Sequence, residues 1–184
     1  DLSVAKLDGE TGLPVFGAEF GLYAAEDIVN VDGKVIVEKD TLLEVAVSDA
    51  NGDIQFVKDY PLGHYYAKEI KAPAGYVSCD DVIEFDAEYQ GQEVKYATII
   101  ATFHNMPTTF EFTKEDITSG AELSGATLTV LDKDGNVVDT WTSKAGEAHV
   151  IKKLVVGESY VLREEFAPYG YLKASDVTFT VEDT

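Results

Sequence analysis

The chain has 184 residues, 45% of them hydrophobic, and a formal net charge of −20 at neutral pH. Both halves are acidic, so nucleic acid and anionic membrane surfaces would repel the protein, and composition argues against either as a partner. The single cysteine, Cys79, leaves no internal disulfide and no cysteine-based zinc site. No run of 18 apolar residues marks a membrane span.

Short strands separated by turns are predicted along the chain. Residues alternate with a period of two, as in strands with one buried face, in segments 2–6, 54–56, 65–69, 83–85, 99–105, 110–114 and 177–181. The dipeptides Asp8-Gly9, Asp32-Gly33, Asn51-Gly52 and Asp134-Gly135 favour tight turns between strands. No window predicts a long amphipathic helix. This pattern indicates an all-β protein built from β-sandwiches.

An internal repeat divides the chain. Residues 65–76 read YYAKEIKAPAGY and residues 160–171 read YVLREEFAPYGY, and both fit the pattern Y-x-x-x-E-x-x-A-P-x-G-Y. A repeat of this kind indicates two homologous modules, and it places Glu69 and Glu164 at equivalent positions. The boundary is predicted at Met106-Pro107-Thr108, which gives domains at 1–107 and 108–184.

Several polar side chains fall on strand faces that are otherwise apolar. Because side chains alternate between the two faces of a strand, Lys6, Glu69 and Asn105 are predicted to point into the core of the first module. The second module repeats the first two of them as Lys114 and Glu164. A buried charge is costly unless it is paired, so the repetition suggests a purpose.

Two interpretations of these residues remain open at this stage. In the first, each lysine and glutamate form a buried ion pair, or the strand ends fray so that both groups reach water. In the second, the groups react. Burial lowers the pKa of an amine and raises that of a carboxyl, by up to about 3–5 units. Lys6 would then be the nucleophile, Asn105 the electrophile and Glu69 the catalytic proton shuttle, with an isopeptide bond and ammonia as products.

Three motifs in order carry a family resemblance. The segments Val4-Ala5-Lys6-Leu7-Asp8 and 17–23 resemble the start of a CnaB-type domain, a repeat module of Gram-positive adhesins and pilins. Glu69 with residues 72–76 resembles the glutamate motif of that family, and Phe103 to Pro107 resembles its closing strand with the bond-forming asparagine. The resemblance implies two tandem prealbumin-like, inverse immunoglobulin β-sandwiches. It also implies a spontaneous isopeptide bond between Lys6 and Asn105.

The second module resembles the collagen-adhesin-like domains used in split covalent tag systems, through segments 112–116 and 125–128 and through Glu164. It departs from the family pattern at its end. The spacing from Glu69 to Asn105, counted from Glu164, runs past Thr184. We therefore expect the second sandwich to lack its final strand. Glu164 is its predicted catalytic carboxyl, and Lys114 is a candidate nucleophile left unpaired with any acceptor.

The resemblance implies a structural stalk module of a cell-wall-anchored, extracellular surface protein, with the anchor outside this segment. Neighbouring domains of the same protein are the expected partners, and the chain is expected to be a monomer without membrane insertion, metal or cofactor. No turnover of an external substrate is expected, so the protein is not predicted to be an enzyme. Two alternatives stand: a module that binds a host glycan or matrix protein, and an accessory β-sandwich of a secreted enzyme.

Overall fold

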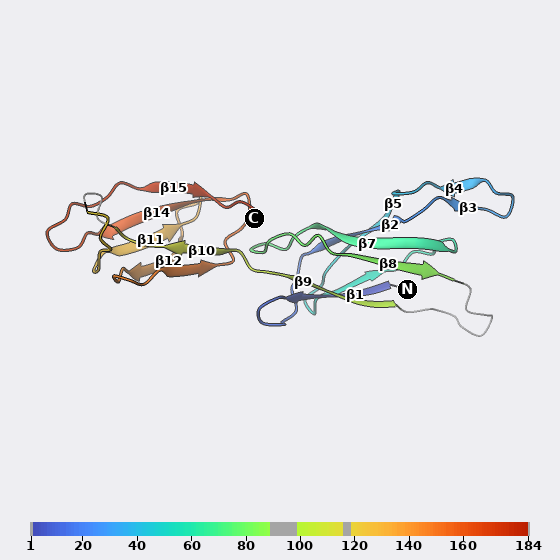
Figure 1. The fold of residues 1–184 in the computed structure, drawn as a ribbon, viewed down its shortest axis with the longest axis horizontal. Helices are drawn as coiled ribbons and strands as arrows, with labels where there is room; N and C mark the ends of the chain where they lie inside the picture. Colours follow the sequence, from blue (N-terminus) through green and yellow to red (C-terminus); the bar gives the residue numbers. More distant parts are fainter. Residues whose placement is uncertain (1, 89–98, 116–118, 184) are drawn as a thin grey trace. The chain divides into compact units, whose positions relative to one another are not determined.

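The computed structural model describes residues 2–88, 99–115 and 119–183. These residues form strands and turns without any helix, which confirms the all-β prediction, and so none of them forms a helix able to cross a membrane (Figure 1). The chain separates into two compact units. The first comprises Asp1–Pro73 and Val77–Pro107, and the second comprises Ala74–Tyr76 and Thr108–Thr184.

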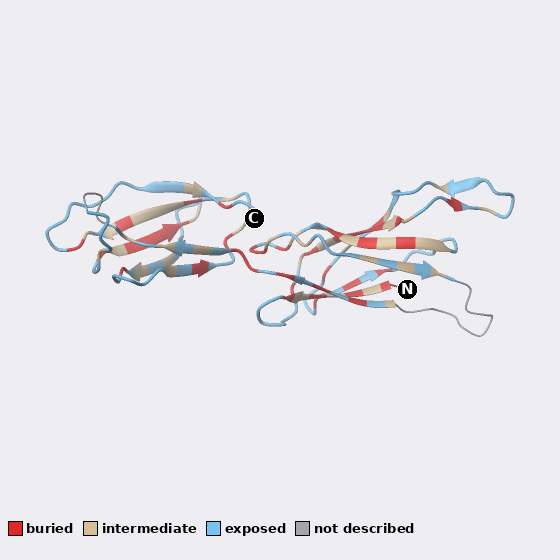
Figure 2. Ribbon diagram, in the orientation of Figure 1, coloured by how far each residue is buried: buried red, intermediate tan, exposed pale blue. Residues whose placement is uncertain are grey.

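The first unit is a sandwich of two sheets. In its smaller sheet the first and last strands of the unit lie side by side. β1 (Leu2–Asp8) lies between β6 (Asp53–Phe56) and β9 (Ile99–Asn105). It pairs with β6 antiparallel and with β9 parallel, so the first and last strands of the unit run in the same direction. Along β1 buried and half-buried residues alternate, which is visible as alternating colour in Figure 2.

The larger sheet of the first unit is antiparallel throughout. Its order is β5 (Leu42–Val47), β2 (Glu19–Ala24), β7 (Gly63–Lys71) and β8 (Val82–Ala87). A separate hairpin joins β3 (Ile28–Val29) to β4 (Val35–Val37). The two sheets enclose an apolar core that includes Val4, Phe20, Leu22, Ile54, Tyr65 and Phe103. Phe20 and Phe103 meet edge to face across it, with ring centroids 4.9 Å apart.

The second unit repeats this plan with fewer strands. β10 (Thr109–Phe112) pairs with β13 (His149–Lys152), as β1 pairs with β6. The larger sheet has the order β12 (Val137–Thr142), β11 (Thr127–Leu131), β14 (Ser159–Phe166) and β15 (Val177–Thr180). Among the described residues of this unit, no strand pairs with the other edge of β10, the place that β9 takes beside β1. The core contains Val130, Ile151, Leu154, Tyr160 and Val181, with the aromatic rings of β10 packed against it.

Candidate functional site: two lysine–glutamate centres

Three strands bring the predicted residues of the first unit together. Lys6 lies on β1, Glu69 on β7 and Asn105 at the end of β9. All three are buried, as the alternation of their strands predicts. Since β1 and β9 are adjacent and β7 belongs to the opposite sheet, the three side chains meet inside the sandwich.

The lysine and the glutamate are in contact without an ordinary hydrogen bond. Lys6 Nζ lies 3.9 Å from Glu69 Oε2, and the exposed fractions of the two side chains are 0% and 1%. Within the described part of the chain, neither of these atoms has a hydrogen-bond partner, and neither has Asn105 Oδ1. Buried polar atoms are almost always hydrogen-bonded in folded proteins, so three such atoms in one place call for an explanation.

The carboxamide of Asn105 is held by its nitrogen. Asn105 Nδ2 donates to Glu69 Oε1 at 2.9 Å and to the backbone carbonyl of Val77 at 2.6 Å. The same Glu69 oxygen accepts the backbone N–H of Cys79 at 2.9 Å. These contacts fix the orientation of both side chains. They also place the amide nitrogen, the atom that an attacking amine would displace, directly against a carboxyl group.

Burial lowers the pKa of the Lys6 amine below its ordinary value, because a charged ammonium is poorly solvated inside the sandwich. The negative charges of Glu69 and Asp81 oppose this effect without cancelling it. A lowered pKa increases the fraction of neutral amine, which is the form that can act as a nucleophile.

The second unit reproduces half of this centre. Lys114 lies two residues beyond the end of β10, with Nζ 3.3 Å from Glu164 Oε1. Glu164 Oε2 accepts the backbone N–H of Ala174 at 2.5 Å, ten residues further along the chain, which matches the spacing from Glu69 to Cys79. Lys114 is thus paired with a carboxyl group. In the described part of the unit, no second strand pairs with β10 to carry a side chain that could accept the Lys114 amine.

Sequence reasoning missed the backbone contacts of both centres. The Val77 carbonyl and the N–H groups of Cys79 and Ala174 belong to the main chain, so residue type gives no signal for them. The structure shows that both N–H groups lie ten residues after their glutamate. Asp116, which closes one of the motifs of the second module, lies outside the described residues. No group of His, Cys, Asp and Glu side chains suited to a metal ion occurs in the part that the structure describes.

Comparison with solved structures finds the same fold in bacterial proteins. The Bacillus anthracis TIE protein superposes with a TM-score of 0.55 at 24% identity, over 99% of this chain and 31% of that chain. A C-terminal fragment of the pilus adhesin SpaC from Lactobacillus rhamnosus GG gives a TM-score of 0.56 at 17% identity, over 99% of this chain and 82% of that fragment. The present chain therefore spans less than a third of the TIE chain. A search of curated proteins finds no match.

A family profile covers both units. The profile described as SpaA, prealbumin-like fold domain, matches residues 1–99 and 108–184. These ranges take in all strands of the second unit and most of the first. The match agrees with the motifs around Lys6 and Glu69 and with the prealbumin-like sandwich of each unit. The chain accordingly belongs to the family of SpaA prealbumin-like fold domains.

Proposed function

We propose that the chain is a structural stalk segment of an extracellular, cell-wall-anchored surface protein, rigidified by a self-formed bond between Lys6 and Asn105. The observation that supports this best is the arrangement of the first centre. A buried lysine, a carboxyl group and a carboxamide meet in it, and one polar atom of each lacks a hydrogen-bond partner. A permanently unreacted cluster of this kind would destabilise the core, whereas reaction removes the buried charge.

The proposed reaction is an acyl transfer within the chain. The neutral amine of Lys6 attacks Cγ of Asn105, and the carboxylate of Glu69 takes the proton that the nitrogen loses. The bond from Cγ to Nδ2 then breaks, and the nitrogen leaves as ammonia after receiving that proton from Glu69. The contact between Nδ2 and Glu69 Oε1 at 2.9 Å is the path for the second transfer. Fixing all three groups in one core supplies the proximity that the step requires.

The proposed bond has a mechanical purpose. It would join β1 to β9, the parallel first and last strands of the unit. Tension applied at the two ends of the unit would then pass through a covalent bond instead of the hydrogen bonds of a sheet. The pilus adhesin fragment among the fold relatives comes from a surface protein, which favours the same role here.

The second centre fits the same proposal as a site that has not yet reacted. Lys114 and Glu164 are in place, with Glu164 already held by the Ala174 N–H. We propose that Glu164 is the catalytic carboxyl of this unit and that Lys114 awaits an acceptor on a strand parallel to β10. No external substrate is turned over in either unit, so the protein acts on itself and is not an enzyme.

The intact mass of the purified, denatured protein tests the proposal. We expect a mass lower than that of the sequence by one ammonia, and a cross-linked peptide that contains Lys6 and Asn105. Lys6→Ala should restore the full mass, while Lys114→Ala should keep the loss. A wild-type protein of unmodified mass would reduce the first centre to a buried polar cluster and remove the support for a covalent stalk.

A further inference from the structure

The two lysines differ sharply in how far they are closed off from solvent. The side chain of Lys6 is 0% exposed, whereas that of Lys114 is 19% exposed, although the side chains of the paired glutamates are both buried, at 1% and 2% exposed. Residues of the turn that precedes β13 line an opening beside Lys114, and the equivalent turn of the first unit precedes β6.

In the first unit a glycine closes the site. The backbone N–H of Lys6 donates to the carbonyl of Gly52 at 2.8 Å. Gly52 has φ of 77°, a conformation that favours glycine, and a Cβ added there would lie 2.4 Å from the carbonyl oxygen of Lys6. No other residue allows this approach of the two backbones. Gly52 therefore lets the turn lie directly against the backbone of Lys6, whose side chain is 0% exposed.

The equivalent turn of the second unit is built differently. Ser48 and Ser143 mark the same place in the two units, because each hydroxyl oxygen accepts the N–H of an alanine, Ala18 or Ala126, at 2.9 or 3.0 Å. Counting four residues on from each serine gives Gly52 in one unit and Glu147 in the other. The turn glycine of the second unit stands one residue earlier, at Gly146, with φ of 77°.

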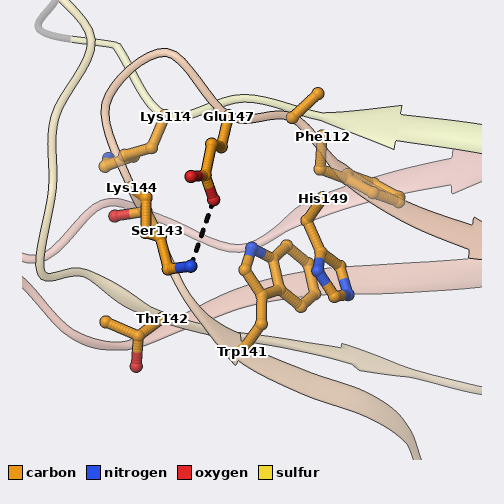
Figure 3. A pocket seen from close by; sticks show the side chains of 9 residues that line it. Phe112, Lys114, Trp141, Thr142, Ser143, Lys144, Glu147 and His149 are labelled. Atoms are coloured by element: carbon orange, nitrogen blue, oxygen red, sulfur yellow. Dashed lines mark ion pairs between the residues drawn. The ribbon is translucent and has the colours of Figure 1, made fainter.

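The second unit has a pocket beside Lys114, at the place equivalent to the buried Lys6 of the first unit. It has a volume of about 230 Å³ and is lined by Lys114, Glu147 and Lys144 on one side and by Phe112, Trp141 and His149 on the other (Figure 3). Trp141 stacks on His149 with ring centroids 4.2 Å apart, and His149 Nε2 lies 2.8 Å from Asp139 Oδ2, so this wall is held in place. Lys144 and Glu147 form an ion pair at 3.1 Å across the turn instead of covering Lys114.

We propose that the position of the turn glycine decides which of the two lysines acyl donors from solvent can reach. Gly52 is a positioning residue that closes Lys6 off for reaction inside its own unit. The shifted turn of the second unit makes Lys114 an acylation site for small activated acyl donors, such as thioesters, that enter from solvent. In that step the Lys114 nitrogen bonds to the acyl carbon, the bond from that carbon to its sulfur or oxygen breaks, and the leaving group departs with the proton of the amine.

The part of this inference that concerns Lys6 rests on the proposed function, whereas acylation of Lys114 does not. The test therefore uses the full chain with Asn105→Leu, in which Lys6 cannot be consumed by bond formation. The folded protein is treated with limiting N-hydroxysuccinimidyl acetate, and acetylation is followed at each lysine by peptide mass spectrometry. Labelling in denaturant confirms that Lys6 is a free amine in this variant, which separates a closed site from a reacted one.

We expect Lys114 to be acetylated within about tenfold of the rate at the exposed Lys71 and Lys133, and Lys6 at least about 100-fold more slowly, because Lys6 reacts only when the unit opens. The double variant Gly146→Asn with Glu147→Gly transfers the Asn-Gly turn of the first unit to the second. It should slow acetylation of Lys114 by about tenfold or more and leave Lys133 unchanged. Glu147→Ala, which removes the same carboxylate without moving the glycine, should have no such effect.

Equal acetylation of Lys6 and Lys114 in the folded protein would overturn the proposal. So would a folded double variant in which Lys114 reacts as fast as before. If the double variant does not fold, as judged by circular dichroism, the comparison of Lys6 with Lys114 in the Asn105→Leu protein still decides whether Lys114 is the lysine that acyl donors reach, because it requires no change in the second unit.

Discussion

The amine of Lys6 should control how bond formation depends on pH. Burial lowers its pKa below the ordinary 10.5, so half of the amine should already be in the neutral, nucleophilic form below that pH. We predict that the rate of bond formation rises with pH and that the midpoint of this rise lies below 10.5. Protein synthesised and kept in denaturant, then diluted into buffers of different pH, allows the loss of ammonia to be followed by mass. A midpoint at or above 10.5 would show an amine whose pKa is not lowered.

The carboxyl of Glu69 should be needed for the chemistry more than for the fold. Glu69→Gln keeps the shape of the side chain and an oxygen for the Cys79 N–H, yet an amide cannot carry a proton between the two nitrogens. General acid–base catalysis is worth about 10²–10⁴-fold, so we predict a slowing of bond formation in that range. The time course of the intact mass measures it. Glu164→Gln serves as the control, since it makes the same change in the other unit and should leave the first bond unaffected.

Some residues of the site could be predicted from the sequence, and others could not. Lys6, Glu69 and Asn105 were predictable because alternation along a strand assigns each side chain to a face without knowledge of its neighbours. The role of Gly52 was not, since Asn51-Gly52 predicts a turn but not what lies against it. The contacts of the Val77 carbonyl and the Cys79 N–H could not be predicted, because every residue other than proline carries the same backbone N–H and C=O groups.

Among the strands, the proposed covalent link between β1 and β9 should carry much of the stability of the first unit. The link would close a loop of about 100 residues, for which chain-entropy arguments give a contribution of roughly 4–5 kcal/mol. We predict that Lys6→Ala lowers the free energy of unfolding of this unit by about that amount, or somewhat more because it also leaves a cavity. Calorimetry of the two proteins measures the loss. Lys6→Met, which fills the space but cannot react, separates the two causes, and identical melting of wild type and Lys6→Ala would contradict the stalk proposal.

The pairing of β7 with β8 should depend on pH through His64. Its Nδ1 lies 2.8 Å from Asp86 Oδ1 and its Nε2 lies 3.3 Å from Glu84 Oε2, and these contacts raise the pKa of His64 above 6.5. A raised pKa stabilises the folded state below the unfolded value and loses this effect as pH rises through the folded value. We therefore predict that His64→Gln lowers the melting temperature of the first unit at about pH 5.5 and has little effect at about pH 8.5. An equal effect at both pH values would assign His64 a packing role only.

One strand boundary shows how tertiary pairing overrides a local pattern. Alternation predicts a strand over 110–114, but β10 ends at Phe112. In the first unit β6 pairs only as far as Ala5, and the remaining residues of β1 are held in the strand by β9. The described residues of the second unit provide no such neighbour for β10, so the strand ends where pairing with β13 ends. Sequence alone predicted the missing partner and not its consequence for the length of β10.

Over the whole molecule, two units of one fold should respond to force in different ways. Both are acidic sandwiches of the same family and are joined in series by the chain. With Lys6 bonded to Asn105, tension passes from β1 to β9 and the residues between them bear no load. On the same proposal the second unit would have no such bond, because Lys114 faces a carboxyl group without an acceptor among the described residues. The repeat would then give one inextensible unit and one extensible unit.

Single-molecule stretching of the full chain, held at its two ends, tests this asymmetry. We predict one unfolding event in the wild-type protein, with a gain in contour length of roughly 25 nm, as expected for the residues of the second unit alone at about 3.3–3.6 Å each. Lys6→Ala should add a second and longer event, because the first unit then unfolds as well. Lys114→Ala should change neither the number of events nor the extension of the first unit. Two events in the wild-type protein would mean that tension reaches the interior of the first unit, which the proposed bond forbids.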